Sequence, residues 1–164
     1  YQYEITDDRE FLDIGRRNTV NFMAPHITHI GVHDHGFNNV STYGNLLRLM
    51  SSDRIPYDAW EKNFYELALK SSGAVQAARW TKLTPETGFI YSFNGPHSLF
   101  ADTVRSLRAL AVSHQLGHKL MGEMDRPISL LERLLQHAET TAPYEVSYGD
   151  PRALYAVRGR PAPA

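Results

Sequence analysis

Apolar residues recur at every third or fourth position along most of the chain, and this period constrains the fold more than any other feature. Such spacing indicates amphipathic helices rather than strands. The predicted helices cover about residues 7–23, 37–51, 57–79, 98–120 and 127–141. Asp7 or Asp8 is placed to cap the first helix, and Pro127 occupies the first helical position of the last one. The predicted fold class is therefore all-α.

Polar segments that contain glycine and proline separate these helices. Residues 25–36 form a histidine-rich loop. Residues 81–96 form a second loop, in which Phe89–Tyr91 has the composition of a short strand or packed turn. Beyond residue 143 the sequence predicts an irregular tail, with a short strand at Tyr144–Tyr148 as one option. Trp60 lies on the apolar stripe of the third helix, so we expect it in the core.

Two units of similar plan follow each other along the chain. Each begins with a polar loop, presents an aspartate, enters a helix and returns along a second helix. Asp34 and Asp102 lie 102 − 34 = 68 residues apart, and the returning helices begin near Tyr57 and Pro127. Short connections favour antiparallel αα-hairpins, the unit of helical toroids and solenoids. We predict one domain over residues 1–164, with hairpins over about 7–142 and both aspartates on the same rim.

Composition excludes several classes of function. The chain has 17 Lys and Arg against 18 Asp and Glu, which argues against a nucleic-acid surface. It has no apolar run long enough to cross a membrane. It has no cysteine, so disulfides and thiolate chemistry are excluded, while the compartment, cytoplasmic or periplasmic, stays open. The start at Tyr1 without a methionine and the Pro/Ala end suggest a piece of a longer protein.

The segment His33-Asp34-His35-Gly36-Phe37 concentrates polar groups directly before a helix. One interpretation is structural: Asp34 caps the helix, which stabilises by about 1 kcal/mol. The other is functional: Asp34 is an acid, a base or a binding group. The spacing alone leaves both interpretations open.

Asp102 is the second candidate, in the first turn of the helix predicted at 98–120. An aspartate there is favoured by the helix dipole. Leu99, Phe100 and Val104 suggest an apolar surrounding, which raises the pKa of a carboxyl and suits a general acid. Arg105 shares a helix face with Asp102, so it can pair with that carboxylate or bind an acidic substrate.

A metal site is an alternative for the histidine-rich loop. His26, His29, His33, Asp34 and His35 crowd ten positions, and their ligand types suit zinc. The sequence has no His-Glu-x-x-His motif or comparable helical spacing. A metal-dependent hydrolase that uses this loop is therefore one alternative function. A non-catalytic helical repeat that binds a partner protein is another.

His33-Asp34-x-Gly-Phe37 resembles the His-Asp-x-Gly-Phe segment of the unsaturated glucuronyl hydrolases, glycoside hydrolase family 88, and of their relatives in family 105. Asp102–Gly117 resembles the second aspartate segment of those enzymes. The resemblance covers about Asp7–Thr141, in order. It implies part of an (α/α)6 barrel of six helical hairpins, of which about two and a half are visible here.

The resemblance also implies a reaction. Family members remove the unsaturated uronic acid that polysaccharide lyases leave on oligosaccharides, by hydrating its C4=C5 double bond. Asp102 would be the principal acid/base and Asp34 its partner, with no cofactor and no metal. Leu99-Phe100-Ala101 and Arg105 depart from the surroundings expected for the second aspartate. The residues assigned to substrate binding are His33, His35, Asn94 and Arg105.

These assignments imply partners and a distance. The partner is an acidic oligosaccharide, with no nucleic acid and no membrane. An incomplete toroid would expose apolar helix faces, which favours a homo-oligomer. If Asp34 and Asp102 act together, we expect their carboxyl groups to lie within about 8 Å of each other at one cleft.

Overall fold

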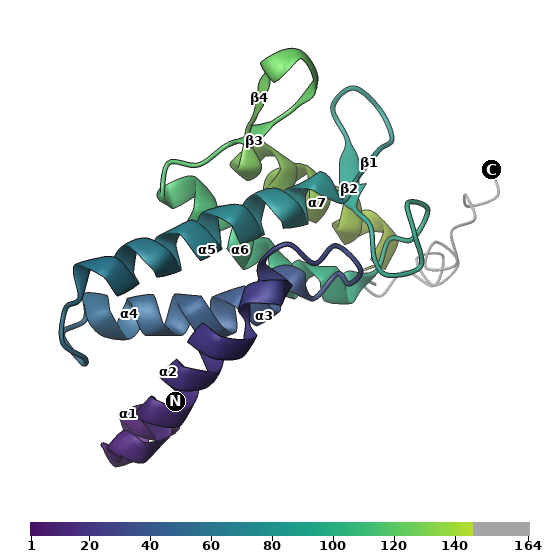
Figure 1. The fold of residues 1–164 in the computed structure, drawn as a ribbon. Coiled ribbons are helices and arrows are strands. Elements are labelled where there is room, and N and C mark those ends of the chain that lie inside the picture. The colour runs from purple at the N-terminus through teal and green to yellow at the C-terminus, as the bar shows by residue number, and fades with distance from the viewer. Residues whose placement is uncertain (146–164) are drawn as a thin grey trace.

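A computed structural model of the chain describes residues 1–145, and it is mostly helical, which confirms the predicted all-α class. Figure 1 shows the longest helix, α5, in the middle of the fold, with the other helices around it. The helices are α1 (Gln2–Thr6), α2 (Arg9–Phe22), α3 (His35–Asn39), α4 (Asn45–Ser51), α5 (Ala59–Ala78), α6 (Leu107–Gln115) and α7 (Leu130–Glu145). None of these helices is long and apolar enough to cross a membrane.

Shorter elements connect these helices. The 3₁₀ segments are η1 (Ala24–Ile27), η3 (Ala101–Ser106) and η4 (Glu123–Asp125), and η2 (Val40–Gly44) is a π-helical segment. The strands are β1 (Trp80–Lys82), β2 (Gly88–Ile90), β3 (Leu120–Met121) and β4 (Pro127–Ile128). β1 pairs with β2 and β3 with β4, both antiparallel. The short strand expected at Phe89–Tyr91 is therefore confirmed, one residue earlier.

The helices predicted in the first half are confirmed, because their end signals are local. Asp8 accepts a hydrogen bond from the Glu10 amide at 2.9 Å and caps α2. Asp58 caps α5 in the same way through the Glu61 amide. The helix predicted at 37–51 is present, but it begins at His35 and contains the π-helical segment η2.

Three predictions for the second half are wrong. The helix predicted at 98–120 is η3 followed by α6, and it ends before Gly117, whose φ of 77° belongs to the left-handed region. Pro127 lies in β4, and Ser129 accepts the Glu132 amide at the start of α7 instead. Residues 143–145, which the prediction assigned to an irregular tail, belong to α7. The remainder of the strand considered at Tyr144–Tyr148 lies outside the described residues.

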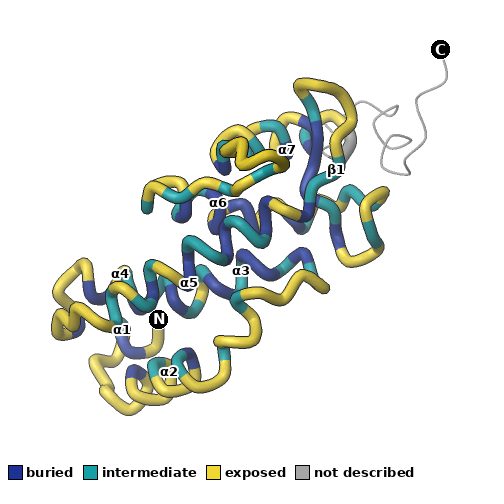
Figure 2. The backbone as a smooth tube through the Cα atoms, turned by 45° about the horizontal axis from the view of Figure 1, so that its top comes forward, coloured by how far each residue is buried: buried dark blue, intermediate teal, exposed yellow. Residues whose placement is uncertain are grey.

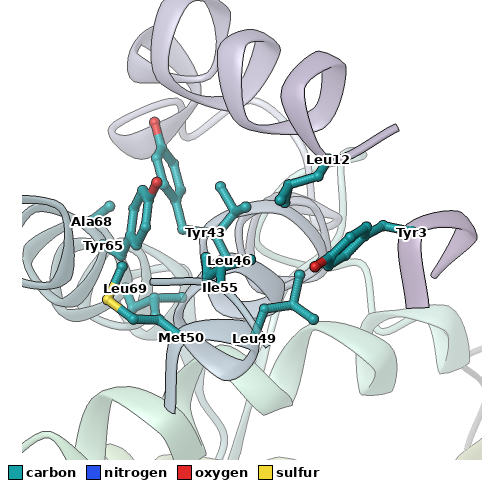
Figure 3. Close-up of a cluster of buried hydrophobic side chains, with 10 residues drawn as sticks. All are labelled: Tyr3, Leu12, Tyr43, Leu46, Leu49, Met50, Ile55, Tyr65, Ala68 and Leu69. Atoms are coloured by element: carbon teal, nitrogen blue, oxygen red, sulfur yellow. The ribbon is translucent and has the colours of Figure 1, made fainter. Parts of the chain in front are cut away.

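Two apolar clusters hold the helices together. The larger one joins α4 to α5, and Figure 3 shows Tyr43 and Tyr65 side by side within it. The smaller one joins α6 and α7 to β2 through Ile90, Leu110 and Leu130. Figure 2 shows buried positions gathered along α5 and α6, whereas most of α2 is exposed. Trp60 is 66% exposed and stacks on Phe64, so the expectation that it lies in the core is wrong.

His137 connects α7 to β2 through a hydrogen bond that requires its neutral form. The Ile90 amide donates a hydrogen bond to His137 Nδ1 at 3.0 Å, which requires an unprotonated Nδ1. Burial lowers the pKa of His137 from 6.5 to about 4. Neutral His137 therefore favours the folded state above pH 6.5, and this contribution is lost as the pH falls toward 4.

We predict that acid weakens the fold through His137. Between pH 7 and pH 5 its share of the unfolding free energy falls by about 2 kcal/mol, since each pKa unit is worth about 1.4 kcal/mol. Urea unfolding at both pH values measures the difference. His137→Asn should flatten the pH dependence, whereas His114→Gln, at an exposed position of α6, should leave it unchanged. An equal pH dependence in all three proteins would contradict the prediction.

Candidate functional site

The start of α3 and the η3 segment meet at one point, where Arg105 joins the two aspartates. Arg105 Nη2 lies 2.5 Å from Asp34 Oδ1 and 2.8 Å from Asp102 Oδ2, and its Nε donates to Asp34 Oδ1 at 3.0 Å. Both carboxylates are partly open to solvent, with 30% and 38% of their side chains exposed. The site thus has two carboxylates on one guanidinium group.

His33 lies beneath this pair and completes it. Its Nε2 is 3.5 Å from Asp34 Oδ1 and 3.5 Å from Asp102 Oδ2, and these three atoms lie within 4.8 Å of one another. The separation of the aspartates is therefore well inside the distance expected for a cooperating pair. His33 is only 5% exposed, and neither of its ring nitrogens makes a hydrogen bond within residues 1–145.

Asp34 stands at the N-cap position of α3, but it does not cap the helix. Two backbone amides of the first turn have other partners: the Gly36 amide donates to Gln76 Oε1 at 3.1 Å and the Phe37 amide donates to Ser106 Oγ at 3.2 Å. Gln76 also donates to the His33 carbonyl at 3.1 Å. The capping interpretation is therefore wrong, because side chains from α5 and η3 leave the Asp34 carboxylate free.

Gly36 allows α3 to approach the η3–α6 segment closely. A Cβ atom at this position would lie 2.5 Å from the Ser106 carbonyl oxygen and 2.8 Å from Ala109 Cβ, both well inside van der Waals contact. Only glycine fits without moving one helix away from the other. The backbone contact at Gly36 is what brings Asp34 within reach of Arg105, 71 residues further along the chain.

The remaining predicted site residues are not brought to the pair. His35 is 2% exposed, and burial lowers its pKa to about 4, so its placement lends no support to its assignment to substrate binding. Asn94 is exposed in the turn that follows Phe93, and it makes no side-chain hydrogen bond to the aspartates within residues 1–145. His26 and His29 face each other at 6.3 Å between ring centroids.

This placement bears on the metal hypothesis. Within residues 1–145, the group whose ligand atoms could converge on a metal ion is His33, Asp34 and Asp102. Two of its three members, His33 and Asp34, belong to the histidine-rich loop, whereas His26, His29 and His35 of that loop are not part of the group. Arg105 already supplies a cation to both carboxylates.

Sequence reasoning missed the aromatic residues around the site. The Phe93 and Phe100 rings lie 5.5 and 5.4 Å from the His33 ring, and both phenylalanines are partly exposed. Arg105 and Arg108 both lie against the Phe37 ring, at 4.9 and 5.8 Å from its centroid. In the sequence Phe100 is an apolar neighbour of Asp102, whereas nothing distinguishes Phe93 except its position in a loop with Gly95 and Pro96.

Comparison with known proteins does not assign this chain to a family. No family model matches the chain, and neither a curated protein nor a solved structure does. Inferences about function therefore depend on the geometry of the site and on the two short motifs that carry the resemblance.

The capping arrangement gives a testable prediction about stability. Asp34→Ala should cost less than about 1 kcal/mol of unfolding free energy, because it removes only a partly exposed ion pair. Gln76→Leu should cost at least about 2 kcal/mol, since the Gly36 amide and the His33 carbonyl would remain buried without their partner. Denaturant unfolding measures both values. A larger loss for Asp34→Ala than for Gln76→Leu would show that Asp34 supports the helix after all.

Proposed function

We propose that this chain is the acid/base part of a glycoside hydrolase that releases unsaturated uronic acid from lyase-generated oligosaccharides. The observation that carries the proposal is the meeting of Asp34 and Asp102 on Arg105, above a buried His33. A pair of carboxylates at one point suits reactions in which a proton is given to a sugar and taken from water. The motif resemblance names the sugar.

The reaction requires a group that donates a proton to the sugar and then accepts one from water. A carboxylic acid delivers a proton to C4 of the C4=C5 double bond, and water adds to C5. The carboxylate that remains accepts the proton which that water loses, so the acid is regenerated. The hemiketal formed at C5 then opens, and the rest of the oligosaccharide leaves. One aspartate can perform both proton transfers, while the second holds the neighbouring charges in place.

The contacts make the two aspartates unequal. Asp34 contacts Arg105 through two guanidinium nitrogens, whereas Asp102 contacts it through one. The Asp102 side chain is also the more exposed of the two. Asp102 is therefore the better placed group to exchange a proton with substrate and water. Asp34 fixes Arg105 and orients the pair.

Recognition of an acidic sugar needs a cation that is free to bind it. Arg105 is occupied by both carboxylates, which weakens its assigned role as a substrate contact. Arg108 makes no ion pair within the described part of the chain, and its guanidinium group lies 5.8 Å from the centroid of the Phe37 ring, against which Arg105 also packs. Arg108 is therefore the preferred partner for the substrate carboxylate, through the charged hydrogen bonds that guanidinium groups form with such anions.

The proposed fold is part of an (α/α)6 toroid, which two features of the chain favour. The two aspartates come from corresponding loops and meet at one end of the helices. A mainly apolar cavity of about 740 Å³ lies between α2 and the η2–α4 segment, and Phe11, Phe22 and Leu46 are among the residues that line it. An apolar opening of this size favours further helices or a second copy of the chain over it.

The decisive experiment incubates the protein with an oligosaccharide freshly produced by a polysaccharide lyase. Loss of the ultraviolet absorbance of the conjugated double bond reports the reaction directly. We expect this loss with the wild type and, at an equal rate, after treatment with a metal chelator. Persistence of the signal with a folded wild-type protein would overturn the proposed function. Loss of activity with chelator, together with stoichiometric zinc, would favour the metal-dependent alternative instead.

A further inference from the structure

Two phenylalanine side chains are exposed beside the proposed acid pair. Phe93 is 58% exposed and Phe100 is 42% exposed, and their ring centroids lie 6.4 Å apart with the ring planes at 81°. Each ring also contacts the ring of His33, whose Nε2 reaches both carboxylates. The phenylalanines and the aspartates therefore form one continuous surface, with His33 as its buried floor.

The loop that carries Phe93 is closed by hydrogen bonds at its base. The Ser92 amide donates to the Ser98 carbonyl at 2.9 Å, and the two hydroxyl oxygens lie 2.9 Å apart. Within the loop the Ser98 amide donates to the Gly95 carbonyl at 2.9 Å, and Gly95 adopts a φ of 104° that favours glycine. The loop is therefore a tightly bonded turn, and Phe93 is at its second position.

A buried arginine fastens the same loop to the end of α5. Arg79 is 3% exposed, and it donates to the carbonyl oxygens of Tyr91 at 3.1 Å and Ser92 at 2.9 Å. Its guanidinium group also lies 4.6 Å from the centroid of the Tyr91 ring. Thr81 adds a hydrogen bond from β1 to the Pro96 carbonyl.

An exposed phenylalanine on a loop held by many hydrogen bonds indicates a site where a ligand binds. A phenylalanine such as Phe93, with more than half of its surface in water, contributes less to folding than a buried one. A rigid support is useful where a side chain must meet a ligand, since less conformational entropy is then lost on binding. The aromatic surface is continuous with the acid pair, so its occupant is the molecule on which that pair acts.

We infer that Phe93 and Phe100 form a stacking platform for the pyranose ring of the substrate. The C–H groups on one face of a sugar ring form an apolar surface that an aromatic ring can cover, while the hydroxyl groups at the edge remain free for hydrogen bonds. This inference rests on the proposed function and adds to it the residues that hold the ring. The platform serves uncharged parts of the oligosaccharide as well, because stacking does not require the carboxylate.

Binding of oligosaccharide to the Asp102→Asn protein, measured by titration calorimetry, tests the platform without turnover. Phe93→Ala in this background should raise Kd about tenfold or more, which corresponds to the loss of about 1.4 kcal/mol. Phe93→Tyr should stay within about twofold, because the ring face is retained. Tyr57→Ala is the control: Tyr57 is 69% exposed just before α5, whereas Gln76, which contacts the His33 carbonyl, lies near the other end of that helix, so the loss of Tyr57 should leave Kd unchanged.

The outcomes separate the platform from the reaction. Equal Kd values for Phe93→Ala and its parent, with both proteins folded by circular dichroism, would overturn the platform even if the wild type hydrolyses the substrate. Conversely, tight binding that depends on Phe93, without loss of the double-bond absorbance, would retain the platform and overturn the reaction. Should Phe93→Ala fail to fold, Phe100→Ala provides the same comparison. Absence of any binding to the parent protein would overturn both proposals.

Discussion

Replacement of Asp102 by asparagine is expected to lower kcat by about two to four orders of magnitude on an unsaturated uronyl oligosaccharide, the range that a positioned acid/base contributes. The amide cannot give or accept the proton that hydration of the double bond requires. It has nearly the same shape as the carboxylate and keeps an oxygen for Arg105, so the fold should be unaffected. Initial rates followed by ultraviolet absorbance measure the effect, and thermal unfolding verifies the fold.

Two further variants make this result specific. Asp34→Asn should lower kcat by a smaller factor than Asp102→Asn, because Asp34 acts on Arg105 and on the charge of the pair. Asp13→Asn, on the exposed face of α2, should leave the rate unchanged. A larger loss for Asp34→Asn than for Asp102→Asn would reverse the assigned roles. Full activity in both site variants would remove the aspartates from the mechanism.

Substitution of Gly36 by alanine is expected to damage the fold and the site together. The added Cβ would lie 2.5 Å from the Ser106 carbonyl oxygen, which belongs to the backbone and cannot rotate away. Either α3 or the η3–α6 segment must therefore move. Such overpacking typically costs about 1–3 kcal/mol. The same movement should separate Asp34 from Arg105 and lower kcat by at least about tenfold, since small misplacements of catalytic groups are costly.

Gly15 provides the matched control for this substitution. It lies within α2 on an exposed face, and an added Cβ would meet nothing within 4 Å. Gly15→Ala should therefore stabilise the protein by about 0.5–1 kcal/mol through helix propensity, without a change in activity. Denaturant unfolding and initial rates measure both variants. If Gly36→Ala kept full stability and activity, the close approach of the two helices would not control the site.

Local signals in the sequence were sufficient for much of the helical framework. Asp8 and Asp58 cap their helices through amides only two or three residues away, so the first half of the chain could be predicted correctly. Pro127 misled the prediction because proline is also acceptable at the edge of a short strand, which is where the structure has it. The end of α6 depends on Gly117 with its left-handed backbone, a weaker signal than a proline.

The candidate site, like the fold, was only partly predictable from the sequence. The sequence pointed to Asp34 and Asp102 because each precedes or begins a helix, and their corresponding places in two units predicted that they share a rim. The sequence did not show which of His33 and His35 lies beside the carboxylates, because residues so close in sequence can point to different sides of the chain in the folded protein. The structure places His33 against both carboxylates and buries His35 away from them.

The sequence by itself determined the helical period of this protein, the cap of α2 and the two aspartates at the entrances to its helices. All of these depend on residues a few positions apart, so the local chain contains enough information. Tertiary structure alone decided what the aspartates contact. Gln76 and Ser106, 40 and 69 residues from the amides that they bind, take over the capping of α3 and leave Asp34 free for Arg105. Interactions across that distance depend on how the helices pack, and no local pattern in the sequence encodes them.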